Sequence, residues 1–535
     1  MPRPRKTALA AAAAVALVLN GPNARPQAAH QHPAGSAEKL GKISFPTTCK
    51  ADVQPRFERA VAMLHSFWFD EAHRAFQEVA SADSACAMAH WGIAMTMLGN
   101  PLIGQPLPEA RLRSALAAAE RAGSLAAQAS PRERGYIDAA LALYRDVGPD
   151  RRPRLQAYEL AMRALREQHP EDPEAAIFYA IAVVANAPAS DLTFARQKHA
   201  AEILTPLFAR QPDHPGLAHY IIHAFDSPRL AEHGLGAARR YADIAPSAPH
   251  ALHMPSHIFT RLGYWDESIA TNRRSAAAEP DSNAAVHPMD YMVYAYLQQG
   301  RDEEARKVVD RAVQNSDRFY GGIIGYNFAA MPARYALERG RWADAAQLRV
   351  PTGAPAYVEA VTRFARAVGA ARSAQPALAN VEIARLLSLR DTLKAAGDSY
   401  WATLVEAQRL AASAWAARVA SDDAAALRLA RAAAELEETV EKHPVTPGPL
   451  LPARELEGDL LLELGRPADA LRSYEKTLER DPNRARALAG AARAAELAKN
   501  TDAARKYYAA LAKLMDRADA DRVEPRMARA FLAGR

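Results

Sequence analysis

Apolar residues recur from about residue 50 to the C-terminus at the three- to four-residue spacing of amphipathic helices. No stretch alternates apolar and polar residues convincingly over the length of a strand, so we expect an all-α chain. Pro212, Pro246 and Pro280 are evenly spaced, and each precedes a new helical pattern. A fixed period of about 34 residues indicates an array of repeated helix–turn–helix units.

The same period returns near the C-terminus. It separates Ala470 from Ala504, and it separates Tyr474 from Tyr508. Gly458 allows two helices to approach closely, Ala470 fits where a larger side chain would clash, and Tyr474 fills the remaining gap. The pattern therefore predicts helix pairs that stack on one another in the same way.

These residues resemble the tetratricopeptide repeat family, whose units of about 34 residues stack into a right-handed superhelix. The likeness is strongest at "GYWDE" (263–267) and across 453–512. The stretches "HSFWFDEA" and "HALHMPSHIFTRLG" also resemble a group of exported bacterial repeat proteins. The resemblance implies a right-handed α-solenoid of stacked helix pairs, in one or two blocks, and it implies architecture rather than a mechanism.

The N-terminus predicts export. The basic leader "MPRPRK" is followed by an uncharged apolar run over 7–19, which is too short to span a bilayer and is typical of a secretory signal. We expect a signal peptide over 1–29 with cleavage near Ala29, and an uncleaved anchor is the alternative. The mature protein would then be periplasmic or secreted, with no membrane span.

The remaining chain divides into three parts. We expect a disordered polar lead over 30–45, a helical array over 46–370 and a second helical block over 371–535. A joint is predicted at 372–380, and the Pro-rich stretch 443–452 is either a connector or a segment that folds over a groove.

The charge of the chain bears on the kind of partner that it binds, and its cysteine content bears on the cellular compartment. The 535 residues carry a net charge of +6, and their 67 basic residues are interspersed with 61 acidic ones, so we expect no nucleic-acid partner. Cys49 and Cys86 predict one disulfide in an oxidising compartment, with two buried thiols as the alternative.

The histidines repeat with the helices. His253 and His257 follow His219 and His223 by one repeat period, so two successive first helices carry the same H-x-x-x-H pair. Residues four apart lie on one helix face, with Cβ atoms about 5–6 Å apart. The step to the next unit is slightly longer, and it maps His250, His253 and His257 onto His287, Asp290 and Tyr294.

The resemblance to tetratricopeptide repeats places these side chains on the concave surface, which the first helix of each unit lines. Pro255 lies between two of the histidines, where it either interrupts the helix or lies in the first turn of a helix that starts later. The predicted groove consists of His219, His223, Asp226, His250, His253, His257, His287, Asp290 and Tyr294.

Two functions fit this groove. The first is a scaffold that binds a protein or peptide partner without catalysis or a cofactor. The alternative is a protein or enzyme that binds Zn or Cu through its histidine pairs, with Asp226, Asp290 or His250 as a further ligand or a hydrogen-bond partner of the ligands. The expected metal ligands are His219, His223, His253 and His257. The sequence shows no H-E-x-x-H motif, no nucleophile elbow and no phosphate-binding loop, and it leaves the oligomeric state undetermined.

Overall fold

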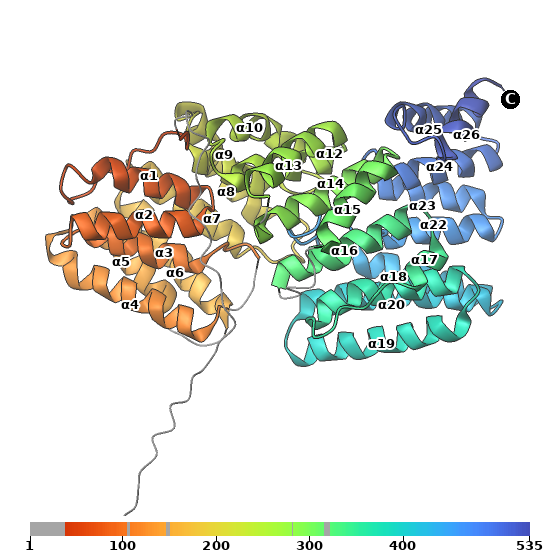
Figure 1. Ribbon diagram of the computed structural model, residues 1–535, viewed down its shortest axis with the longest axis horizontal. Coiled ribbons are helices and arrows are strands. Elements are labelled where there is room, and N and C mark those ends of the chain that lie inside the picture. Colours follow the sequence, from red (N-terminus) through yellow and green to blue (C-terminus); the bar gives the residue numbers. More distant parts are fainter. Residues whose placement is uncertain (1–37, 104–106, 146–149, 281, 315–321, 535) are drawn as a thin grey trace, which may run out of the picture. The chain divides into compact units, whose positions relative to one another are not determined.

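The computed structural model describes residues 38–103, 107–145, 150–280, 282–314 and 322–534, and Lys39–Arg535 form one compact unit (Figure 1). The predicted signal peptide, 1–29, lies outside the described residues, as do residues 30–37 of the predicted lead. In the described ranges every regular element is a helix, which confirms the all-α prediction. None of these helices combines the length and the apolar composition needed to cross a bilayer.

The helices follow one another with short connections. The first are α1 (Gln54–His65), α2 (Phe69–Ala82), α3 (Ala87–Leu98), α4 (Glu109–Leu125), α5 (Pro131–Tyr144), α6 (Arg151–Gln168), α7 (Pro173–Ala185) and α8 (Ala195–Arg210). The next are α9 (Pro215–Phe225), α10 (Ala231–Ile244), α11 (Pro249–His253), α12 (Pro255–Leu262), α13 (Trp265–Ala278), α14 (Val286–Gln298), α15 (Asp302–Gln314), α16 (Gly322–Glu338) and α17 (Trp342–Ala346). The last are α18 (Ala356–Arg372), α19 (Pro376–Ala395), α20 (Ser399–Val419), α21 (Asp423–Glu437), α22 (Ala453–Glu463), α23 (Pro467–Arg480), α24 (Ala485–Leu497), α25 (Thr501–Leu514) and α26 (Glu524–Leu532).

The helices stack as a solenoid. Consecutive helices pack against each other, and the alternate helices α9, α12, α14, α16, α18, α20, α22 and α24 also contact one another in a continuous inner row. Helix α1 returns to contact α9, so the N-terminal turn of the array packs directly on the helix that carries His219 and His223. This arrangement is the one predicted for stacked helix–turn–helix repeats.

Short apolar and small residues keep the array continuous across the expected boundary at residue 370. One hydrophobic cluster extends from Tyr326 to Leu460 and includes Val368, Ala371 and Ala379 on the two sides of that boundary. Within the predicted joint at 372–380, residues 373–375 form the turn between α18 and α19, which pack against each other, and 376–380 belong to α19.

The second half of the predicted lead is ordered. Leu40 and Phe45 are buried, and the Lys42 backbone N–H donates to the Asp213 carbonyl at 3.0 Å. The expectation of disorder is therefore wrong for residues 38–45, because Leu40 and Phe45 join the hydrophobic core, where the Phe45 ring packs against those of Phe57, Trp91 and Tyr136.

A disulfide joins Cys49 to Cys86, with Cα atoms 4.8 Å apart, and this is the pairing that the sequence predicts. It ties the segment before α1 to the residue that precedes α3. The last helices also return to the middle of the chain: a Cβ atom on Gly263, whose φ is +68°, would lie 2.4 Å from the Pro482 carbonyl oxygen. Only glycine permits both that backbone angle and that approach.

Candidate metal centre

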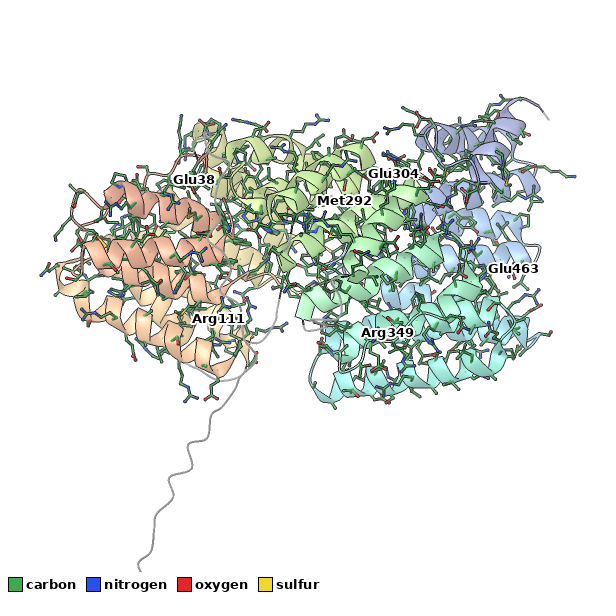
Figure 2. All side chains as sticks on the ribbon, in the orientation of Figure 1. Glu38, Arg111, Met292, Glu304, Arg349 and Glu463 are labelled. Carbon is green, nitrogen blue, oxygen red and sulfur yellow. A yellow bond between two sulfur atoms is a disulfide. The ribbon has the colours of Figure 1, made fainter. Side chains whose placement is uncertain are left out.

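Three neighbouring units of the inner row carry the histidines. Helix α9 provides His219 and His223, α11 and α12 provide His250, His253 and His257, and α14 provides His287. Figure 2 shows the side chains on these helices, with Met292 marking α14.

Pro255 interrupts the middle helix. Helix α11 already begins at Pro249, and α12 restarts at Pro255 after Met254, whose φ and ψ of −54° and −36° remain helical. Pro255 thus both interrupts the helical run and lies in the first turn of α12, while α11 before it keeps His250 and His253 helical. Because the chain continues in nearly the same direction, His253 and His257 stay on one face and their Nε2 atoms come within 3.0 Å of each other.

The six histidines form two groups of three. Site 1 is His219, His223 and His250, and site 2 is His253, His257 and His287. Within each site one ring nitrogen from each residue lies within 4.8 Å of the other two. Each site thus combines an i, i+4 pair from one unit with a single histidine from the next unit.

The repeat also accounts for there being two such sites in the described part of the chain. Gly216 stands one repeat period before His250, and a Cβ atom there would lie 2.5 Å from His65 Nδ1, so no histidine fits at that position. At the other end Asp290 and Tyr294 replace the next i, i+4 pair, and the Asp290 carboxylate is bound by Arg334 Nε at 3.0 Å. The series of histidines therefore stops on both sides.

Hydrogen bonds fix the ring protons in site 2. Asn272 Nδ2 donates to the Ser268 carbonyl at 2.7 Å, which leaves Asn272 Oδ1 to accept the Nδ1–H of His253 at 2.6 Å. His257 Nδ1–H donates to Asp226 Oδ2 at 2.8 Å. Both Nε2 atoms therefore carry lone pairs when the rings are neutral, and these lone pairs face each other across 3.0 Å.

Site 1 repeats part of this arrangement. His219 Nδ1–H donates to the His65 carbonyl at 2.6 Å, so its Nε2 has a lone pair, and this atom lies 3.1 Å from His223 Nε2. The third histidine of each site has a buried nitrogen without a hydrogen-bond partner: Nε2 of His250 and Nδ1 of His287. Buried ring nitrogens are ordinarily paired, so each of these two atoms has an unused lone pair or N–H at its site.

Burial disfavours protonation of the rings. His219, His223, His253 and His257 are at most 7% exposed, whereas His250 and His287 are half-buried. Burial lowers the pKa of all six, and neighbouring imidazoles lower it further in most of them. The pKa of His253 falls to about 3. Neutral imidazole is the form that binds metal ions.

A balanced set of charges lies beside site 2. Asp226 accepts hydrogen bonds from Arg261 Nε at 2.9 Å and Lys442 Nζ at 3.3 Å, and Arg261 Nη2 also pairs with Glu441 at 2.7 Å. Although burial raises the pKa of Asp226, Lys442 and Arg261 hold it well below its usual range. Burial lowers the pKa of Lys442 to about 8. The two acidic and two basic side chains cancel, so the surroundings add no net negative charge to the histidine sites.

Aromatic rings exclude water from the histidines. The Phe67 ring centroid lies 4.4 Å from that of His219 and 5.5 Å from that of His250. In site 2 the Tyr291 ring lies 5.0 to 5.2 Å from the rings of all three histidines. Such an apolar surrounding strengthens electrostatic interactions inside a site.

A third group of possible ligands, His65, Glu174 and His214, differs from the two sites. Glu174 accepts from His65 Nε2 at 2.9 Å and from His214 Nε2 at 2.8 Å. Their Nδ1 atoms are paired with Tyr220 Oη and with the Leu217 backbone N–H. Every ring nitrogen is satisfied, so this group is complete as a hydrogen-bonded structural unit and needs no ion.

The groove expected beyond the histidines is closed by the chain itself. The Pro-rich stretch 443–452 folds over α14 and α16, where Tyr291 Oη donates to the Thr446 carbonyl at 3.3 Å. Arg334 donates to the carbonyls of Gly448 and Pro449 at 2.7 and 2.8 Å. Asp290 and Tyr294, predicted to line an open groove, are at most 1% exposed for this reason.

The predicted residues are thus brought together differently from the expectation. The four histidines expected to be the metal ligands divide between two groups. Asp226 orients a histidine, and Asp290 faces Arg334. His250, which the sequence named as one candidate for a further ligand, and His287, which it assigned only to the groove, complete the two groups. The sequence signal that could have identified these two ligands is the step from one repeat unit to the next, which maps His250 onto His287.

Comparison with known proteins leaves the family unassigned. No protein-family model and no curated protein matches the chain. A solved structure described as the human IFIT1 dimer with PPP-AAAA is 12% identical, covering 85% of this chain and 89% of that one at a TM-score of 0.38. The human IFIT1 dimer with m7Gppp-AAAA is 11% identical over 80% and 90% of the two chains, at a TM-score of 0.36.

Proposed function

We propose that this protein binds transition-metal ions of the copper and zinc class at sites 1 and 2. The observation that carries the proposal is the pair His253 and His257. Both rings commit their Nδ1 protons to Asn272 and Asp226, so two lone pairs meet at 3.0 Å. Without a cation between them this contact is repulsive, and burial disfavours the alternative of an added proton.

The spacing suits a metal ion. Two imidazole nitrogens that bind one ion at about 2.0–2.1 Å are about 3.0 Å apart when the angle at the ion is about 95°. The Nε2 atoms of both i, i+4 pairs have this separation, 3.1 Å in site 1 and 3.0 Å in site 2. The Nδ1–H groups of His219, His253 and His257 donate to a carbonyl, an amide and a carboxylate oxygen, and such acceptors orient histidine ligands in metal sites.

A peptide partner in the histidine-lined groove receives less support. The surface beyond site 2 is already occupied by 443–452, whose backbone takes the place that an extended peptide would take. Export remains part of the proposal, and the disulfide between Cys49 and Cys86 is consistent with an oxidising compartment.

Metal analysis of protein purified without an affinity tag tests the proposal. We expect two equivalents of copper or zinc after titration and gel filtration. His223→Gln and His257→Gln should each remove one equivalent. The control His73→Gln, which replaces a half-buried histidine that pairs with Thr96, should retain both.

The third group supplies an internal control. Because His65, Glu174 and His214 satisfy one another, Glu174→Gln should not change the metal content. Uptake below about 0.1 equivalent at stoichiometric metal, or loss of metal in the Glu174 variant alone, would contradict the assignment of sites 1 and 2.

A further inference from the structure

The two sites are direct neighbours. The ring centroids of His223 and His257 are 6.0 Å apart, and so are those of His250 and His253. This equals the separation of His257 and His287 within site 2. At such distances no described helix or loop lies between the rings, so ions in the two sites would lie within reach of one shared small ligand.

The ligand set is uncharged and incomplete. Each site offers three neutral imidazoles, and three protein ligands leave at least one coordination position open on each ion. The half-buried side chains of His250 and His287 are the most exposed of the six histidines. Asp226, the carboxylate nearest to the ligands, is already compensated by Arg261 and Lys442.

The charge of the two ions therefore determines which ligand occupies their open coordination positions. Two divalent ions would bring four positive charges into a buried region that supplies no net negative charge, which is costly in a low-dielectric interior. An anion placed between the ions reduces this cost most. Water provides it when an ion-bound molecule loses one proton to bulk solvent and becomes hydroxide, since bound metal lowers the pKa of water strongly.

The imidazole ligands and the relative affinities of divalent metal ions for nitrogen sites favour copper. Three-histidine coordination without thiolate or carboxylate suits copper, and Cu(II) binds nitrogen sites more tightly than the other divalent first-row ions. From the juxtaposition of two tri-histidine sites in neutral surroundings, we infer that sites 1 and 2 together form one dinuclear copper centre whose ions share a hydroxide bridge. This inference rests on the proposed function, and it adds the identity of the ions and their coupling.

Electron paramagnetic resonance of the intact protein loaded with two equivalents of Cu(II) tests the inference. A bridging hydroxide couples the two unpaired electrons, so the integrated signal should account for only a small part of the copper present. His223→Gln and His257→Gln each leave one ion without a partner. Each variant should bind one copper and show a full signal for it, whereas His73→Gln should behave as the wild type.

The outcomes separate the two proposals. Two bound copper ions with two full signals would overturn the dinuclear centre and leave metal binding intact. A preparation that takes up two zinc ions but no copper would overturn the copper assignment alone. If neither metal binds, both proposals fail. Circular dichroism of the two variants, with helix content equal to that of the wild type, ensures that lost signals reflect the site rather than the fold.

Discussion

Replacing Asn272 by leucine tests whether the hydrogen bonds around site 2 prepare it for metal. Asn272 Oδ1 accepts the Nδ1 proton of His253 at 2.6 Å in the buried interior. Leucine has nearly the same size but offers no acceptor. In the variant the proton of His253 moves to Nε2, the atom that faces His257 and would bind the ion.

The expected loss of metal affinity follows from the position of that proton. Metal binding to the variant must return it to Nδ1, where the Ser256 hydroxyl at 3.4 Å is a poor acceptor, at a cost of about 1–3 kcal/mol. Since about 1.4 kcal/mol corresponds to tenfold in affinity, site 2 should bind metal about 5- to 150-fold more weakly. Site 1 should be unaffected, because His219 donates to the carbonyl of His65 instead.

Competition with a copper chelator measures the change. The His223→Gln background disables site 1, so that a single affinity is titrated. At free copper 100 times the dissociation constant, metal stabilises the native state by about 2.7 kcal/mol, and a 10- to 100-fold weaker site reduces this to about 1.4–0.4 kcal/mol.

Thr260→Val provides the matched control. Its hydroxyl lies 3.0 Å from Ser268 Oγ, so the variant also loses one buried hydrogen bond near site 2 but touches no imidazole proton. Equal copper affinity of Asn272→Leu and Thr260→Val would refute the reasoning that a fixed His253 tautomer serves metal binding.

Three further predictions concern the scaffold. Gly216→Ala places a Cβ atom 2.5 Å from His65 Nδ1 and should lower the free energy of unfolding by about 1–3 kcal/mol. Urea denaturation measures this change, and an unchanged unfolding midpoint would contradict the close packing at Gly216. Reducing the Cys49–Cys86 disulfide should cost about 2–4 kcal/mol, seen as a lower melting temperature with reductant. Arg334→Met leaves a buried carboxylate uncompensated, at about 3–5 kcal/mol, and should expose 443–452 to proteolysis; equal cleavage rates would count against the loop's attachment.

The sequence by itself determined the helical repeat and the register of the histidines. The repeat period sets where each helix begins, and the i, i+4 spacing places His219 with His223 and His253 with His257 on one helix face. Local periodicity is sufficient for both, because each depends on residues within one unit or on the repetition of that unit.

Only the tertiary structure decided how the histidines are shared and what surrounds them. The third member of each site comes from the next unit, so it depends on the distance and rotation between stacked helices, which the period does not give. The closure by 443–452 joins Tyr291 to Thr446 across 155 residues of chain. The charge-balanced surroundings of site 2 likewise depend on the contact between Asp226 and Lys442, which are 216 residues apart in the chain. Such contacts arise from the path of the whole superhelix, and no local pattern encodes them.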